Sequence, residues 1–588
     1  MFSNHKNTAF LVVFLCCLML MGGCNRLATP WKWGGDKKKK SQKNPYRVSY
    51  VRDYAYPYNM HLVAIEGFGL VCGLRGTGAP EPPGAERDMV LRELQKRNVN
   101  RPNELLDSKD TAMVRLQGIL PPGVMGGDRF DVKVSIRPGS DVQSLRGGYL
   151  LRTSLREMGV MDNNSLKQGF PLGYVEGPIM LSPSISSQSN PMELVYGKIL
   201  GGGLANKDRP LYLTMKDEHV SEFNTKRVAD QINKRFFTKI GGKTEGVATA
   251  KTDTIVELRV HPTYKDNIER YMQVLLSVVC YETVEQRGKR IEELKKTVLE
   301  RKTAQDSALK LEALGKPGIE SLKGGLTSSD PEIRFYCAES LAYLDVVQAV
   351  KPLAEIAKTE PAFRVRAFGA LSSMHSDLEA EAALREMLND NSAETRYGAF
   401  RALWMRNPYD LAIRGETLGT YENANQFNYH VLNITGTPLI HVTYSKRPEL
   451  VLFGNDIHLS NAFVLDAGTS ILVSRTDGQG EVKVSRLNSL QSRIVTNRLD
   501  EIIKAIVDLG GSYPDVVQML LEAQSQKVLP CKIEIDKLPQ SGRIYTRTKE
   551  EEAVEEEKKK TFWSRLNPNT CIEEGNEDPN FSTADWKE

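Results

Sequence analysis

The stretch GFGLVCGLRGTG (residues 67–78) puts five glycines into twelve residues and is followed by prolines at positions 80, 82 and 83. The glycines are Gly67, Gly69, Gly73, Gly76 and Gly78. So much bare backbone either cradles a phosphate or lets two segments of main chain approach each other closely. The spacing of the glycines decides between these two uses.

That spacing fits neither common nucleotide-binding motif. A dinucleotide fingerprint needs glycines at positions one, three and six, but the sixth position counted from Gly67 is Cys72. A P-loop needs a lysine and then a hydroxyl residue after its last glycine, whereas Ala79 and Pro80 follow Gly78. We therefore expect no nucleotide cofactor and interpret the glycines as determinants of fold or assembly.

Other sites of chemistry are not indicated either. The cysteines after residue 24 are scattered singly, without the CxxC spacing of a zinc or redox site. The histidines lack the HExxH spacing of a metalloprotease, and no GxSxG elbow is present. The sequence thus predicts a protein that is not an enzyme, with no catalytic, cofactor-binding or metal-binding residues.

The first residues predict export. Lys6 precedes the apolar run AFLVVFLCCLMLM, which is too short to span a membrane and is typical of a signal peptide. The run ends in LMGGC, which resembles a bacterial lipobox and predicts a signal peptide over 1–23 with lipid attached to Cys24. The alternative is an ordinary signal peptide with a chance cysteine. A polar linker is expected over 24–45.

The chain of 588 residues is long enough for several domains, and 78 basic against 74 acidic residues give no field that would attract nucleic acid. Residues 46–283 are predicted to form an α+β core. Strands are expected over 112–120 and 129–136, and a helix that begins at Asn224 or Thr225.

Residues 284–420 are predicted to be helical and contain an internal repeat. The segments DPEIRFYCAESL, EPAFRVRAFGAL and SAETRYGAFRAL align on Arg334, Arg364 and Arg396, at spacings of 30 and 32 residues. This period is typical of HEAT-type helical hairpins, which stack to bury a common core. We expect the aligned arginines to order the stack internally and not to bind a ligand.

Strand-like segments return in a third region, residues 421–540. They are followed by two short helices separated by Gly510 and Gly511, and by a final strand in CKIEID. The remainder, 541–588, is charged and is expected to be a mobile tail.

Three groups of motifs carry a resemblance to a known family. Residues 62–78, the segment TAMVRLQGILPPGVMGGDRFDVKVSIRPGSDVQSLRGGYLLRTSL (111–155) and YVEGPIML (174–181) are similar to the flagellar P-ring protein family. Residues 425–536 resemble the C-terminal segment of that family. The resemblance implies a β-rich core with short helices, interrupted here by an all-α HEAT-like block that we interpret as an insertion on a surface loop.

The resemblance implies a structural role. A P-ring subunit would form a ring of identical copies around the distal rod in the periplasm, as a bushing at the level of the peptidoglycan, beside the outer-membrane L ring. The apparent lipobox departs from the plain signal usual in that family and predicts anchoring to the outer membrane, with retention in the inner membrane as the alternative. The inserted block would enlarge the ring or offer a surface to another envelope protein.

In a ring, the glycines named above and the segment SLRGGYLL, with Arg146, Gly147 and Gly148, are predicted determinants of assembly or fold. Arg146 would be free to pair with an acidic residue of the next subunit. For each glycine taken singly, a turn inside one subunit is an equally good interpretation. Two rival functions remain: a lipid-anchored adaptor whose repeats recruit a protein partner, and an enzyme whose site has no recognised motif.

Overall fold

The computed structural model describes residues 48–160, 166–182, 191–375, 377–419, 426–476, 480–487 and 489–546. The chain divides into two compact units, Met1–Val48 and Ser49–Glu588, and the description below concerns the second. Cys24, the predicted signal peptide, the linker and most of the predicted tail lie outside the described residues. None of the helices in the described ranges combines the length and apolarity needed to span a bilayer.

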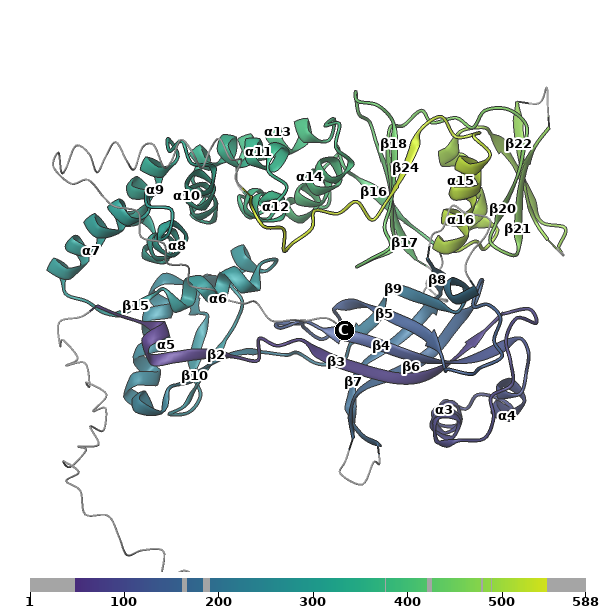
Figure 1. Cartoon of the computed structure of the whole chain (residues 1–588), viewed down its shortest axis with the longest axis horizontal. Helices are drawn as coiled ribbons and strands as arrows, with labels where there is room; N and C mark the ends of the chain where they lie inside the picture. Colours follow the sequence, from purple (N-terminus) through teal and green to yellow (C-terminus); the bar gives the residue numbers. More distant parts are fainter. Residues whose placement is uncertain are drawn as a thin grey trace, which may run out of the picture. The chain divides into compact units, whose positions relative to one another are not determined.

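A closed, antiparallel β-barrel is formed by the part of the chain that carries the glycine motif (Figure 1). It closes because β5 pairs with β4 on one side and with β9 on the other. Alternate residues such as Val132 and Val134 fill its core, together with Ile65 and Leu116. The strands are β3 (Val63–Cys72), β4 (Thr111–Leu120), β5 (Arg129–Ile136), β6 (Tyr149–Val160), β7 (Leu166–Pro178) and β9 (Tyr196–Ala205), with β8 (Met180–Leu181) added on β9.

Two short helices, α3 (Ala85–Lys96) and α4 (Pro102–Leu106), follow the glycine motif. Val90 and Leu94 of α3 and Leu106 of α4 pack on Leu70 and Met113 of strands β3 and β4. This small cluster is separate from the core that fills the barrel. The outward side of β3 is therefore covered, and the motif is held from both sides.

A second, smaller sheet has the order β13-β14-β10-β2 and packs against helices α5 and α6. Helix α5 begins at Glu222, earlier than predicted, because the side chain of Ser221 accepts a hydrogen bond from the Asn224 amide and caps the helix there. The elements are β2 (Ala55–Tyr58), β10 (Leu211–Met215), β13 (Ala248–Ala250), β14 (Ile255–Leu258), α5 (Glu222–Arg235) and α6 (Ile268–Leu276), with the pairs β1 (Ser49–Tyr50)–β15 (Val279–Tyr281) and β11 (Phe237–Ile240)–β12 (Lys243–Gly246) beside them.

The predicted helical block is confirmed as a run of helices. The three aligned arginines lie in α10, α12 and α14, the second helices of successive hairpins. The helices end at Arg406, so strand β16, which belongs to the next sheet, falls inside the range predicted to be helical. They are α7 (Val284–Thr297), α8 (Ala304–Leu314), α9 (Ile319–Gly325), α10 (Pro331–Tyr343), α11 (Val350–Thr359), α12 (Arg364–Ser373), α13 (Leu378–Met387) and α14 (Ala393–Arg406).

The C-terminal region encloses helices α15 (Leu499–Asp508) and α16 (Tyr513–Ser525) between two sheets (Figure 1). Both helices bury apolar faces, which include Ile503 and Leu520. One sheet is mixed, in the order β16 (Gly415–Leu418), β17 (Phe427–Leu432), β19 (Glu449–Phe453), β18 (Leu439–Val442) and β24 (Lys532–Ile535); the other is antiparallel, with β20 (Phe463–Ala467), β21 (Ile471–Arg475), β22 (Glu481–Arg486) and β23 (Ser492–Thr496).

One hydrophobic core joins the second sheet, the helical block and part of the C-terminal mixed sheet. It runs from Leu213 and Tyr271 through Leu341 and Phe400 to Val451. The helices of the block thus bury side chains of the elements before and after it, and its interpretation as an insertion on a surface loop stays a prediction. The overall class, an α+β protein with a HEAT-like helical block, is confirmed.

Candidate functional site

The glycine motif begins inside a strand and not in a loop. Gly67 and Gly69 lie in β3, where it runs beside β6. A Cβ atom on Gly67 would lie 2.6 Å from the carbonyl oxygen of Ser154, and one on Gly69 would lie 2.6 Å from Oγ1 of Thr153. The two glycines thus allow a close approach between two strands of one chain.

The rest of the motif forms a turn whose backbone is already paired. Gly73 and Gly76 have φ values of +86° and +90°, which favour glycine. The amide of Leu74 donates to the Asp110 carbonyl, that of Gly78 to Lys109, and that of Ala79 to Thr111. These three amides are unavailable to a phosphate.

The segment that contains Arg146 meets this turn. Gly147 has a φ of +71°, and a Cβ atom on Gly148 would lie 2.6 Å from Cγ1 of Val71. The structure therefore brings the two predicted glycine segments together inside one chain. Arg146 is exposed, and its guanidinium has no ion-pair partner among the described residues.

Arg75, which was not among the predicted site residues, connects the glycine turn to the C-terminal region. Its guanidinium donates to the carbonyl of Thr469 at 2.6 Å and to Oγ of Ser470 at 2.7 Å. Arg75 adopts a φ of +48°, unusual for a residue with a Cβ atom. Arg75 lies between Gly73 and Gly76 in the sequence, and these two glycines were the one signal for an unusual backbone conformation here.

The three repeat arginines, Arg334, Arg364 and Arg396, each make the same kind of contact. Each reaches back six residues to a backbone carbonyl at or just beyond the end of the preceding helix: Arg334 to Ser328, Arg364 to Lys358 and Arg396 to Asp390. A guanidinium at a helix C-terminus satisfies carbonyls that have no partner within the helix. The arrangement joins the two helices of a hairpin and leaves these donors occupied.

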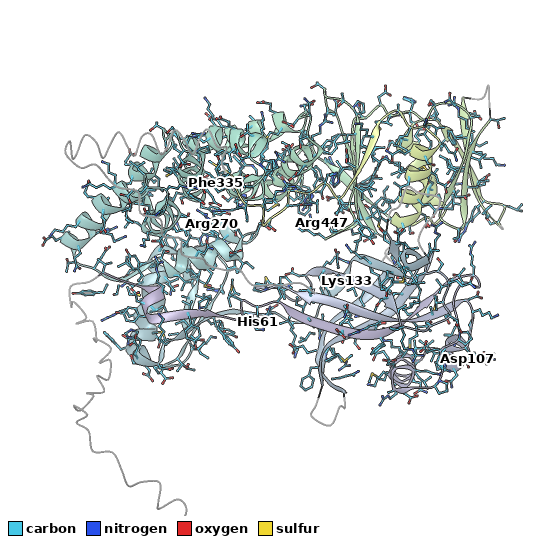
Figure 2. All side chains as sticks on the ribbon, in the orientation of Figure 1. His61, Asp107, Lys133, Arg270, Phe335 and Arg447 are labelled. Carbon is cyan, nitrogen blue, oxygen red and sulfur yellow. The ribbon has the colours of Figure 1, made fainter. Side chains whose placement is uncertain are left out.

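A buried ion cluster joins the helical block to α6. The guanidinium of Arg270 lies 2.5 Å from Oε2 of Glu312 and 2.6 Å from Oε2 of Glu339. The side chains of Arg270, Glu312 and Glu339 are 4%, 0% and 1% exposed, and Arg366 pairs with Glu339 from the other side. Figure 2 labels Arg270 in this region. We call these four residues the first ion cluster.

A second ion cluster joins the other end of the block to the mixed sheet. Glu449, fully buried at the start of β19, accepts a hydrogen bond from the Tyr397 hydroxyl at 2.5 Å and from Arg401 at 2.9 Å. Burial by itself would raise the pKa of Glu449, but the charges of Arg401 and Arg447 hold it below its usual value. His441 stacks on the Tyr397 ring, with 3.9 Å between the ring centroids.

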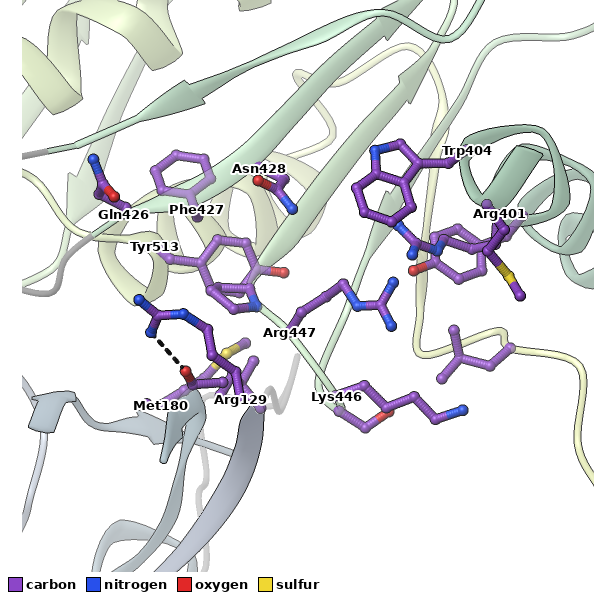
Figure 3. Close-up of a pocket in the computed structure, with 18 of the residues that line it drawn as sticks. Arg129, Met180, Arg401, Trp404, Gln426, Phe427, Asn428, Lys446, Arg447 and Tyr513 are labelled. Carbon is purple, nitrogen blue, oxygen red and sulfur yellow. Dashed lines mark hydrogen bonds between the residues drawn. The ribbon is translucent and has the colours of Figure 1, made fainter. Parts of the chain in front are cut away.

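A cleft of about 990 Å³ lies beside the second ion cluster (Figure 3). Its lining comes from the barrel, from α12 and α14, and from the turn between β18 and β19. Phe427, Tyr513 and Trp404 supply aromatic surface. Four cationic side chains also line it, namely Arg129, Arg401, Lys446 and Arg447. Asp128, Glu176 and Asp266 line it as well, so the cleft suits a peptide that carries acidic and basic groups together better than a neutral one.

The four cationic side chains differ in whether they already have hydrogen-bond or ion-pair partners. Arg129 donates to the carbonyl of Gly201 at 3.0 Å, and Arg401 is paired with Glu449. Within the described part of the chain, the side chains of Lys446 and Arg447 have no hydrogen-bond or ion-pair partner. The turn SKRP is a weak signal for this site, since it places both cations next to a proline in the sequence.

Comparison with known proteins finds two matching families. Residues 51–292 match the family described as flagellar P-ring protein, and residues 319–404 match HEAT repeats. Among curated relatives, the flagellar P-ring protein of Caulobacter vibrioides is 30% identical over 220 residues, which is 35% of this chain and 55% of the relative. Those of Geobacter metallireducens and Thermotoga maritima are 27% and 24% identical, over 54% and 65% of their lengths and 35% and 38% of this chain.

The first match covers the barrel, the second sheet and the beginning of α7. The chain spans about half to two thirds of the length of these relatives. The family match does not extend to residues 425–536, so the C-terminal part of the resemblance stays a prediction. Over residues 51–292 this chain is similar to the flagellar P-ring protein family, and over residues 319–404 to HEAT repeats, as the glycine motif and the arginine period predicted.

Proposed function

We propose that this chain is a non-enzymatic structural subunit of the bacterial flagellar basal body, which assembles with identical copies into a P ring around the distal rod. The observation that carries the proposal is the match of residues 51–292 to flagellar P-ring proteins. These residues build a closed barrel with a core of its own, together with the second sheet.

The physical role of the subunit follows from two closed structures, the ring and the barrel. A ring repeats one heterologous contact between two different faces of the subunit. A closed barrel leaves few unpaired strand edges, so its contacts with neighbours are made by side chains on a rigid body. Such a collar would act sterically, as a bushing between the rod and the peptidoglycan beside the L ring, and needs no cofactor.

Arg146 is our candidate for a contact between subunits, because it is exposed, has no ion-pair partner in the described part of the chain, and projects from a turn fixed by Gly147 and Gly148. It would pair with an acidic side chain of the next copy. We also propose that Cys24 carries a lipid, which would hold the ring at the inner face of the outer membrane.

The test is electron cryo-microscopy of basal bodies purified from the source cell. The proposal expects a ring at the level of the peptidoglycan whose subunits each carry the helical block as a recognisable row of antiparallel helices. A strain with the gene deleted serves as control and should lose that ring. A P ring without helical-block density, or one that is unchanged in the deletion strain, would contradict the proposal.

A second candidate function is a lipid-anchored adaptor that recruits a protein partner through the repeats. The observation that favours it is a set of exposed apolar side chains near the end of the block: Leu378, Tyr409 and Leu411 are 78%, 84% and 84% exposed. The ion pair between Arg385 and Asp410 ties the two segments that carry them.

Deletion of residues 284–420 would not separate the two functions, because it would leave Arg270 and Glu449 without their buried partners. The replacement of Leu378, Tyr409 and Leu411 by serine spares the core and removes the exposed patch. A ring subunit should still assemble with these three substitutions, whereas an adaptor should lose its partner and leave the basal body unchanged.

A further inference from the structure

The cleft beside the second ion cluster contains two cations whose side chains have no hydrogen-bond or ion-pair partner among the described residues. Lys446 and Arg447 project from the turn between β18 and β19 toward Arg401, and Figure 3 shows the three side chains together. The pKa of Lys446 lies below its usual value because of desolvation and because Arg447 and Arg401 add like charge. An anionic group placed here would relieve that repulsion.

The surrounding surface favours a peptide over a small ion. The cleft extends over about 990 Å³ and includes the indole of Trp404, on which the Arg401 guanidinium stacks at 4.3 Å. Buried aromatic rings of Phe427 and Tyr513 add apolar surface. A segment that carries several carboxylates between small apolar residues complements both features.

The last described residues of the chain lie close to this cleft. Leu538 and Pro539 line it, and the ring of Tyr545 rests on Phe363 with 5.1 Å between the centroids. Phe363 is the N-cap of α12, and Val365, Phe368 and Gly369 of the same helix line the cleft. Along a helix, the six steps from Phe363 to Gly369 span about 9 Å. The last described residues therefore lie beside one wall.

The residues that follow have the complementary charge. EEEAVEEE (550–557) carries six carboxylates around Ala553 and Val554, and Lys558–Lys560 follow at once. Its first glutamate is four residues beyond Thr546 and its last is eleven, so an extended chain reaches about 14 to 38 Å. That reach exceeds the distance to the cleft along α12.

We propose that the cleft is the docking site of the acidic segment 550–557 of the same chain, whose carboxylates bind Lys446 and Arg447. The acidic lining residues Asp128, Glu176 and Asp266 would then face the lysine run that follows. Docking closes the cleft to other acidic peptides and gives the C-terminal segment a fixed place on the protein. The inference does not depend on the proposed ring, since it concerns a single chain.

Zero-length carbodiimide cross-linking of the full chain, followed by peptide mass spectrometry, tests the proposal. The reagent condenses an amine with a carboxylate that lies in direct contact. We expect amide links from Lys446 to glutamates 550–557, at least fivefold more abundant than links to Lys483, an exposed lysine of β22 outside the cleft. Equal yields at the two lysines would overturn the proposal.

Two further cross-linking experiments ask whether the acidic segment comes from the same chain and whether charge holds it in the cleft. In a mixture of isotopically light and heavy chains, the links should join residues of the same chain; links mainly between light and heavy chains would overturn docking within one chain. Arg447→Glu should reduce the Lys446 links at least fivefold, whereas Arg493→Glu, at an exposed site on β23, should leave them unchanged.

Salt provides a readout that needs no variant. An increase in ionic strength from about 0.05 to about 0.5 M should reduce the Lys446 links severalfold, because it screens the exposed charges. A yield that is independent of salt would contradict docking by charge. Circular dichroism of each variant checks that it has folded, and the salt series on the unmodified chain decides the question if Arg447→Glu does not fold.

Discussion

The two ends of the helical block are attached to their neighbours by different kinds of buried polar contact. At the first end, Arg270 and Arg366 are matched with Glu312 and Glu339. At the second end, the single carboxylate of Glu449 is shared between Arg401 and the hydroxyl of Tyr397. The first contact balances two cations with two anions, whereas the second depends on one residue.

The second end also holds a buried imidazole. His441 stacks on Tyr397 and is fully buried, and among the described residues neither ring nitrogen has a hydrogen bond of ordinary geometry. Its pKa is lowered to about 4, chiefly because burial disfavours the charged ring. The comparison teaches that one block can be tied at both ends by buried charge, and that the second end also buries an imidazole through which we expect it to respond to pH.

The largest effect is expected when the first cluster loses its central cation. Arg270→Met leaves Glu312 and Glu339 buried beside each other and should lower the free energy of unfolding by about 3–5 kcal/mol. Urea denaturation measures it. Arg366→Met is the matched control, because Arg366 is 34% exposed and its loss should cost about 1 kcal/mol or less. Equal effects of the two variants would show that Arg270 is not the centre of the cluster.

The second cluster should respond somewhat less to the loss of its carboxylate charge. Glu449→Gln keeps the shape of the side chain but leaves the Arg401 guanidinium, 13% exposed, without its anion. We expect a loss of about 3 kcal/mol in the same denaturation assay. If the double variant Glu449→Gln with Arg401→Met is no more stable than Glu449→Gln alone, the unpaired cation is not the cause of the loss.

Acid should weaken the second end through His441. The unfolded chain binds a proton on this histidine near pH 6.5, whereas the folded chain binds it only near pH 4, so the unfolded state holds more protons between these values. Stability is therefore lost as the pH falls through that window, by about 2 kcal/mol between pH 7 and pH 5.

His441→Phe keeps a ring on Tyr397 and removes the titration. The difference in unfolding free energy between the variant and the unmodified chain, measured from pH 7 to pH 5, isolates the contribution of this residue. Arg334→Ala, which removes a hydrogen bond to the Ser328 carbonyl and no ion pair, should leave the pH dependence nearly as it is. A parallel pH dependence in the His441→Phe variant and the unmodified chain would refute the difference between the two ends.

The smallest effect is expected between the two ends, at Arg334, whose side chain joins the helices of one hairpin by a hydrogen bond. Arg334 donates to the carbonyl of Ser328 at 2.9 Å, and Arg334→Ala should cost about 1 kcal/mol. Thermal denaturation measures the change. A loss as large as that of Arg270→Met would mean that the repeat arginines hold the block together as firmly as the buried clusters.

Much of the local structure could be predicted from the sequence. Strand β5 has the bounds that were predicted for it, because Phe130, Val132 and Val134 alternate with exposed residues and a proline-glycine turn precedes them. The arginine period marked three helices of the block. The start of α5 was placed too late because the cap is made by Ser221, which lies outside the apolar period.

The candidate sites could be predicted only in part. The glycine segments were recognised, but their partners in β6 were not, because the pairing of β3 with β6 is not local. Lys446 and Arg447 were missed, since a pair of cations at a turn is ordinary until the charges around it are known. The tie between Arg75 and Thr469 joins residues 394 positions apart and has no signature in the sequence.

The sequence by itself determined the strands, the helices and the repeat, together with the family resemblance of residues 51–292, because these depend on neighbouring residues and on ordered motifs. Only the tertiary structure decided the closure of the barrel through β5 and β9, the pairing of Arg270 and Glu449 with the helical block, and the cationic cleft. The physical reason is that the energy of a buried charge depends on the groups that surround it in space, and these come from segments far apart in the chain.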